Sequence, residues 1–242
     1  MKNYFIFIFF ILAFVYVFIR AARAETADDI IDRFIAARGG KDKLNSIDSI
    51  YMEGNLEDMP VEAKAKITKI EGKLYRAKYE YQGTESYTVV TPERGWYYFP
   101  LDSEPTKEMR PDEFKSMQTE LDITGPLTDY KAKGQQAIPQ GKEMVNEREC
   151  YRILVILPDG RHSIYFIETE SYLLIKSIQI VEKFSPLSRQ PEIVVTNWYD
   201  DYKNFGGVLF PQRIITDGAT MGRYSYVFHK IELNIAVDEN VV

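Results

Sequence analysis

Cysteine and histidine are scarce in this 242-residue sequence, which holds one cysteine, Cys150, and two histidines, His162 and His229. One cysteine excludes an intrachain disulfide, and two histidines leave few residues for a histidine-based metal site or catalytic triad. Cys150 begins an apolar run that ends at Leu157, where a buried, inert thiol is expected and a reactive thiol is the alternative. The sequence predicts no metal site, no cofactor and no catalytic residues.

The sequence also lacks a basic block. Its 30 basic and 36 acidic residues give a net charge of −6, and no basic stretch is interleaved with aromatic residues. Because an acidic surface repels phosphate groups, we expect no nucleic-acid partner and no bulk attraction to anionic lipid. Glycine and proline are present in ordinary numbers, 14 and 11, and 45% of the residues are hydrophobic, as is typical of a chain that folds.

The first 24 residues have the pattern of an export signal. Lys2 precedes 16 residues of apolar character, from Tyr4 to Ile19, and Ala22-Arg23-Ala24 is a small-x-small cleavage site. We expect a signal peptide over residues 1–24, cleaved after Ala24; an uncleaved anchor is the alternative, since roughly 17 residues span a bilayer. The remaining residues, 25–242, would keep 27 basic residues against 36 acidic ones, a net charge of −9.

Helical patterns occur in two places. Thr26 is placed as an N-cap with Asp29 three residues later, and apolar residues recur at helical spacing until Gly39-Gly40 ends the run. A second start at Pro111 is followed by Phe114, Met117 and Leu121 and ends at Gly125-Pro126. The sequence therefore predicts an N-terminal helix and a short mid-chain helical insertion.

The rest of the chain has the pattern of β-strands. Apolar and polar residues alternate, turn sequences such as Glu71-Gly72 and Asn204 to Gly207 separate the segments, and 17 Tyr and 14 Phe favour sheets. The pattern predicts a mainly β (α+β) fold: one strongly curved antiparallel sheet, an incomplete barrel of about ten or eleven strands, closed by the two helical segments. The expected strands are 61–67, 75–81, 87–91, 96–99, 136–145, 150–157, 163–168, 172–183, 193–202, 208–216 and 223–233.

Several short motifs carry a resemblance to a known family. They are Ala37-Arg38-Gly39-Gly40 at the end of the first helix, Gly95-Trp96 with Pro100, Trp198 to Tyr202, Gly206-Gly207 and Phe210-Pro211. With the predicted element order, residues 25–235 resemble the LolA-like outer-membrane lipoprotein-sorting proteins of the LolA/LolB superfamily. The resemblance implies a curved barrel around helices, with a hydrophobic cavity for acyl chains of a lipoprotein or another lipid.

The resemblance implies two functions between which the sequence does not choose. One is a monomeric periplasmic carrier that shields acyl chains on the way to the outer membrane, with a membrane protein as donor or acceptor. The other is a sensor or interaction module of the same fold that binds a membrane-protein partner in envelope stress signalling. An exported hydrolase is the third hypothesis. Its candidate acidic pairs are Asp200 with Asp201 and Glu168 with Glu170. We expect these four residues to be solvated turn residues.

Candidate ligand-binding residues are the large apolar side chains of these elements. For each of them ordinary packing is the alternative. Ile31 and Phe34 are candidates for the cavity floor, and Phe114, Met117 and Leu121 for a lid. The candidates for the concave wall are Tyr79, Trp96, Tyr98 and Trp198.

Overall fold

One antiparallel sheet of 13 strands makes up most of the computed structural model, which describes residues 25–58, 62–182, 192–219 and 222–237. The predicted signal peptide, residues 1–24, lies outside the described residues. The strands are β1 (Ser49–Glu57), β2 (Ala63–Ile70), β3 (Leu74–Tyr81), β4 (Thr84–Val90), β5 (Gly95–Tyr98), β6 (Thr106–Glu108), β7 (Gln136–Val145), β8 (Arg148–Ile156), β9 (His162–Glu168), β10 (Leu174–Glu182), β11 (Glu192–Phe205), β12 (Val208–Ala219) and β13 (Gly222–Leu233).

The sheet is an open meander whose first and last strands are neighbours. β1 pairs with β13, so the order runs β6-β5-β4-β3-β2-β1-β13-β12-β11-β10-β9-β8-β7, and within the described residues the edges β6 and β7 do not pair. This confirms the predicted single curved antiparallel sheet. Two strands exceed the expected number, because the three residues of β6 are all exposed and the alternation of β1 is interrupted at Gly54.

Gly54 marks a bulge where β1 meets β13. The register shifts between Glu53 and Gly54, and a Cβ on Gly54 would lie 2.1 Å from the carbonyl oxygen of Val227. Only glycine allows this approach, and a bulge increases the local bend and twist of the sheet. Gly54 therefore contributes to the curvature that makes one face of the sheet concave.

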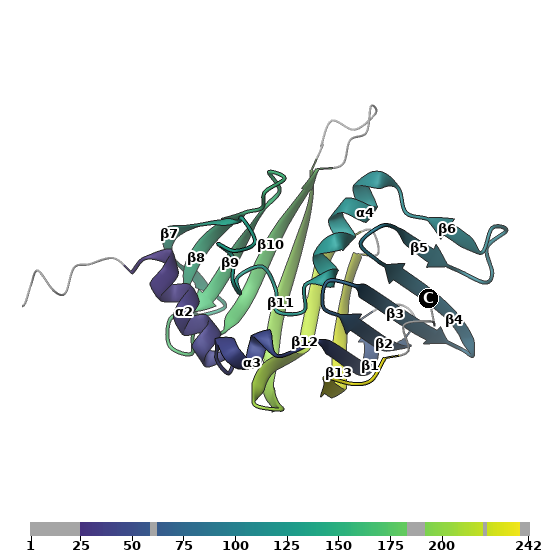
Figure 1. The fold of residues 1–242 in the computed structure, drawn as a ribbon, viewed down its shortest axis with the longest axis horizontal. Coiled ribbons are helices and arrows are strands. Elements are labelled where there is room, and N and C mark those ends of the chain that lie inside the picture. Colours follow the sequence, from purple (N-terminus) through teal and green to yellow (C-terminus); the bar gives the residue numbers. More distant parts are fainter. Residues whose placement is uncertain (1–24, 59–61, 183–191, 220–221, 238–242) are drawn as a thin grey trace, which may run out of the picture.

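Helix α2 (Ala27–Ala37) covers one end of the concave face. Thr26 and Asp29 form the predicted capping box, and the buried stripe contains Ile30, Ile31 and Phe34. Figure 1 shows α2 in front of β7, β8 and β9, and its buried residues belong to the same core cluster as residues of β8 and β9. A short helix, α3 (Lys41–Asn45), follows the two glycines that end α2.

The mid-chain insertion forms the second helical piece, α4 (Pro111–Met117) followed by the 3-10 helix η1 (Gln118–Leu121). η1 lies against β2, β3 and β4, at the other end of the concave face from α2. No helix among the described residues is long and apolar enough to cross a membrane.

Two strand ends differ from the sequence prediction. Asp200 and Asp201, expected in a solvated turn, are exposed residues within β11, which continues to Phe205. β12 likewise continues through Asp217 and Gly218 to Ala219, beyond residue 216, where the sequence predicts that this strand ends. Both strands are longer because β11 and β12 pair with each other from Thr196 opposite Asp217 to Phe205 opposite Val208, and this backbone pairing outweighs the local turn preference of Asp and Gly.

Candidate functional site

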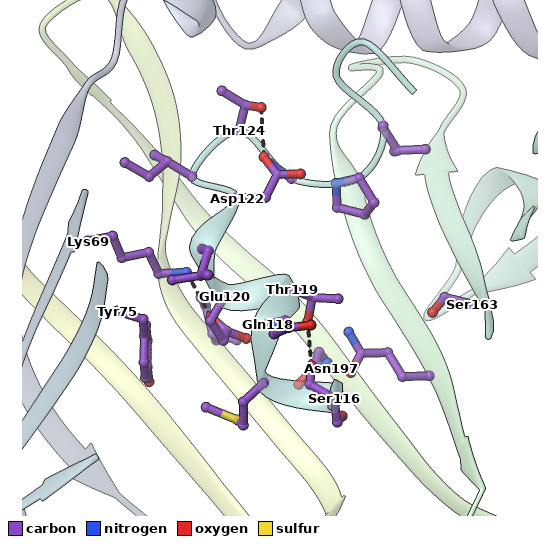
Figure 2. A pocket seen from close by; sticks show the side chains of 18 of the residues that line it. Lys69, Tyr75, Ser116, Gln118, Thr119, Glu120, Asp122, Thr124, Ser163 and Asn197 are labelled. Atoms are coloured by element: carbon purple, nitrogen blue, oxygen red, sulfur yellow. Dashed lines mark hydrogen bonds and ion pairs between the residues drawn. The ribbon is translucent and has the colours of Figure 1, made fainter. Parts of the chain in front are cut away.

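A cavity of about 970 Å³ lies between the concave face of the sheet and residues 111–127, which we call the lid segment. This volume is at the upper end of the range of ligand pockets. Figure 2 shows part of the lid segment, with Gln118, Thr119 and Glu120, between Lys69 and Tyr75 on one side and Ser163 on the other. Sheet, lid segment and the end of α2 all contribute lining residues.

The apolar part of the cavity wall comes from strands in the middle of the sheet and from β8 near one of its ends. Ile50 and Ile67 come from β1 and β2, Val155 from β8, and Phe228 from β13, and each is buried and lines the cavity. Phe34 of α2 adds an aromatic ring. An apolar ligand in this space would be shielded from water by the same residues that form the protein core.

The lid segment is attached mainly at the β2–β3 hairpin. The Gly72 amide donates to the Leu121 carbonyl at 2.9 Å, the Ile123 amide donates to the Glu71 carboxylate at 2.8 Å, and Lys69 pairs with Glu120. Burial raises the pKa of Glu71. At its other side the lid segment has an ion pair of 3.4 Å between Lys115 and Asp159, and exposed pairs of this kind contribute little.

Arg38 joins α2, the lid segment and the sheet. Its guanidinium donates to the Thr124 carbonyl at 3.0 Å and lies over the rings of Phe34 and Phe210. Its carbonyl accepts the Leu209 amide at 2.8 Å. Burial lowers the pKa of Arg38, which still lies far above neutrality for a guanidinium. Arg38 therefore places a positive charge at the cavity wall.

A tyrosine cluster forms the wall beside the lid segment. The hydroxyl oxygens of Tyr79 and Tyr226 are 2.7 Å apart, and the Tyr226 ring stacks on Phe228. The Lys69 ammonium is 5.3 Å from the ring centroid of Tyr75. Burial raises the pKa values of Tyr75, Tyr79 and Tyr226, so these phenols are neutral hydrogen-bonding groups at neutral pH.

A second polar feature crosses the middle of the concave face. Five residues on five adjacent strands stand opposite one another in the register of the sheet, and each carries a hydroxyl or amide group. All but the fully buried Ser177 line the cavity. We call this set the polar row: Tyr224, Thr216, Asn197, Ser177 and Tyr165.

Four of the nine candidate residues from sequence line the cavity. Phe34 lies at its α2 end, Tyr79 on the tyrosine wall, and Met117 and Leu121 on the lid segment. Ile31 and Phe114 lie outside the lining: Ile31 is fully buried on the core-facing side of α2, and Phe114 packs beside Gly95 on β5. That any of these residues binds a ligand stays a prediction.

The three aromatic residues Trp96, Tyr98 and Trp198 point away from the cavity. Trp96 lies under the Arg94 guanidinium, and Tyr98 packs on Tyr87 with ring centroids 5.8 Å apart. Trp198 is flanked by Lys176 and Arg223. Because strand residues alternate between faces, their neighbours line the cavity instead: Tyr97, Asn197 and Tyr199.

Sequence reasoning missed the polar residues of the cavity. Arg38 and Tyr199 stand inside the motifs that carry the family resemblance, so a signal for them is present in the sequence. Thr216 and Asn197 give no such signal, because their importance depends on the register of β11 against β12.

Other reactive groups do not gather into a site. Among the described residues, no group of three or more His, Cys, Asp or Glu side chains is placed to hold a metal ion. Cys150 is fully buried, and burial raises its pKa to about 11, so its reactive thiolate form is scarce at neutral pH.

Comparison with known proteins shows which fold the chain has. No family model and no curated protein matches the sequence. A LolA superfamily protein from Nitrosomonas europaea is 12% identical and superposes with a TM-score of 0.57 over 90% of this chain and 98% of its own. The chain has a LolA-like fold.

Two further solved structures share the LolA-like fold. A DUF1329 family protein from Desulfovibrio piger is 11% identical, with a TM-score of 0.58 over 89% of this chain and 96% of its own. A domain from Vibrio parahaemolyticus, named for outer membrane lipoprotein sorting, is 15% identical, with a TM-score of 0.54 over 89% of this chain and 94% of its own. At such identities the likeness concerns the fold, which many functions can share.

Proposed function

We propose that this protein is a monomeric periplasmic carrier, which takes acyl chains of lipoproteins or other lipids into its cavity during transport to the outer membrane. The observation that carries the proposal is the cavity of about 970 Å³ with buried aliphatic and aromatic side chains on its wall. A structure with the same fold is named for lipoprotein sorting, which supports the same reading.

The physical mechanism is sequestration without a bond-breaking step. Moving an acyl chain from water into an apolar cavity stabilises it by roughly 0.8 kcal/mol per CH₂ group. Entry and exit need the lid segment to move, and its ion pair with Asp159 is weaker than its hydrogen bonds to the Gly72 amide and the Glu71 carboxylate. The lid segment would therefore open from the β8–β9 side.

Native mass spectrometry of the protein purified from an exporting bacterial host, followed by organic extraction, tests this function. We expect a bound phospholipid or other acylated molecule. The substitution Met117→Asp, which places a carboxylate on the lid segment wall of the cavity, should abolish this binding. A mass equal to the chain alone, with no lipid gained on incubation with phospholipid vesicles, would contradict the carrier function. That result would favour a module that binds a membrane-protein partner.

A further inference from the structure

The middle of the cavity wall contains a chain of hydrogen bonds that ends at Tyr199. The Thr216 hydroxyl donates to the Asn197 side-chain oxygen at 2.8 Å. The Asn197 amide nitrogen donates to the Ser177 hydroxyl oxygen at 3.5 Å, and that oxygen is 3.0 Å from the Tyr199 hydroxyl. The chain thus connects β12, β11 and β10 beneath the cavity.

Either hydroxyl of the Ser177–Tyr199 pair can donate to the other. Because Ser177 already accepts from Asn197, the arrangement that also uses the Ser177 hydrogen has Ser177 donating to the Tyr199 oxygen. In this arrangement Tyr199 accepts, and its own hydroxyl hydrogen has no acceptor among the four residues of the hydrogen-bond chain. Tyr199 lines the cavity, and burial raises its pKa to about 12, so this hydrogen is present at neutral pH.

The surroundings of Tyr199 favour a neutral acceptor. Thr216, Asn197 and Ser177 carry no charge. The Arg38 guanidinium, whose charge acts on Tyr199, already donates to the Thr124 and Leu209 carbonyls. Two lysines of the cavity wall already have carboxylate partners: Lys69 pairs with Glu120 at 2.7 Å and Lys133 with Asp122 at 2.6 Å. A bound carboxylate or phosphate would have to compete with these partners, whereas a carbonyl oxygen needs only one donor.

We propose that the Tyr199 hydroxyl donates a hydrogen bond to the carbonyl oxygen of an acyl ester or amide held in the cavity. The ligand class is then an acylated molecule, recognised at the bond that joins the acyl chain to the rest, and a plain alkyl chain of the same length binds less tightly. This inference rests on the proposed carrier function. It assigns a specificity role to Tyr199 and a positioning role to Thr216, Asn197 and Ser177.

Two neutral probes that differ at one carbonyl group test the inference. 1-Palmitoylglycerol contains an ester, and 1-O-hexadecylglycerol replaces it with an ether. Their affinities for the full-length protein are measured by displacement of the fluorescent amine N-phenyl-1-naphthylamine. We expect the ester to bind about tenfold more tightly, the effect of one hydrogen bond to a buried donor.

Three substitutions locate the effect. Tyr199→Phe should remove the preference for the ester and leave the ether unchanged, and Thr216→Val, which keeps the Tyr199 hydroxyl but breaks the chain, should reduce the preference. Tyr98→Phe removes a tyrosine hydroxyl on the opposite face of the sheet and should change neither affinity. Thermal unfolding of each variant verifies that it folds.

The results separate the inference from the proposed function. Equal affinities of ester and ether for the wild-type protein, or an equal loss of both in Tyr199→Phe, would overturn the assignment of Tyr199 while the carrier function stands. If neither probe displaces the dye and no lipid is taken up, the carrier function itself fails, and the inference fails with it.

Discussion

The hydroxyl oxygens of Tyr79 and Tyr226 lie 2.7 Å apart, although β2 and β1 separate the strands that carry them. On a flat sheet, three steps of about 4.8 Å would separate their backbones by roughly 14 Å. Ala65 stands next to Tyr79 in register and Gly54 next to Ala65, so no side chain larger than a methyl group fills the space between. Curvature and two small residues together bring the tyrosines into contact.

Removal of this contact has a measurable effect on stability. Tyr79→Phe leaves the buried Tyr226 hydroxyl without its partner, so we expect the free energy of unfolding to fall by about 1 kcal/mol. Urea denaturation measures it. Tyr81→Phe, on the same strand but 39% exposed, is the control and should leave stability unchanged. An equal effect of both substitutions would contradict the bridging role of the Tyr79–Tyr226 hydrogen bond.

Gly39 and Gly40 differ in what surrounds them, although both have positive φ angles of 126° and 91°. A Cβ on Gly39 would lie 2.4 Å from the Gly207 carbonyl oxygen, whereas a Cβ on Gly40 meets nothing within 4 Å. We expect Gly39→Ala to lower the free energy of unfolding by about 3 kcal/mol and Gly40→Ala by about 1 kcal/mol. Equal losses in urea denaturation would show that the close approach to Gly207 is unimportant.

The stability of the protein should depend on pH through Glu71, which holds the lid segment. Burial raises its pKa above the usual 4.5, so the folded protein holds this proton more tightly than the unfolded chain does. The stability that results is present below pH 4.5 and is lost as the pH rises through the folded pKa. Relative to Glu71→Gln, whose side chain keeps the acceptor for the Ile123 amide, the wild type should therefore become less stable between pH 4 and pH 8.

Urea denaturation of both proteins across this range measures the effect. A difference between wild type and Glu71→Gln that does not change with pH, or that changes in the opposite direction, would contradict the upward shift of the Glu71 pKa.

Cys150 is predicted to be unreactive in the folded protein. It is fully buried, and burial raises its pKa to about 11. At neutral pH a reagent therefore cannot reach the sulfur, and little of the thiol is in the reactive thiolate form. Ellman's reagent at pH 7.5 should leave the native protein unlabelled and label one thiol per chain after denaturation. Rapid labelling of the native protein would show an exposed thiolate instead.

Local features of the fold are predictable from sequence because they depend on neighbouring residues. The capping box of Thr26 and Asp29, the end of α2 at Gly39 and the turn at Glu71-Gly72 all form as expected. Each involves residues at most four positions apart, so the sequence contains all the interacting groups.

The cavity is less predictable because it depends on which face of each strand becomes concave. At β5 both faces carry aromatic residues, and the concave face contains Tyr97 rather than Trp96 or Tyr98. The polar row requires the register of five strands at once, from Tyr224 to Tyr165. A single sequence gives the alternation within a strand but not the pairing between strands.

The most direct test of the account is whether bulk placed inside the cavity excludes an acyl chain. Ile214 lines the cavity, and the adjacent Ile215 stands in register with the outward-facing Trp198. We expect Ile214→Trp to weaken binding of 1-palmitoylglycerol by at least about tenfold, because the indole displaces several CH₂ groups, and Ile215→Trp to leave it within about twofold of wild type. Dye displacement on variants of wild-type thermal stability measures both affinities. Unchanged binding in Ile214→Trp, or equal losses in the two variants, would contradict the claim that this cavity holds the acyl chain.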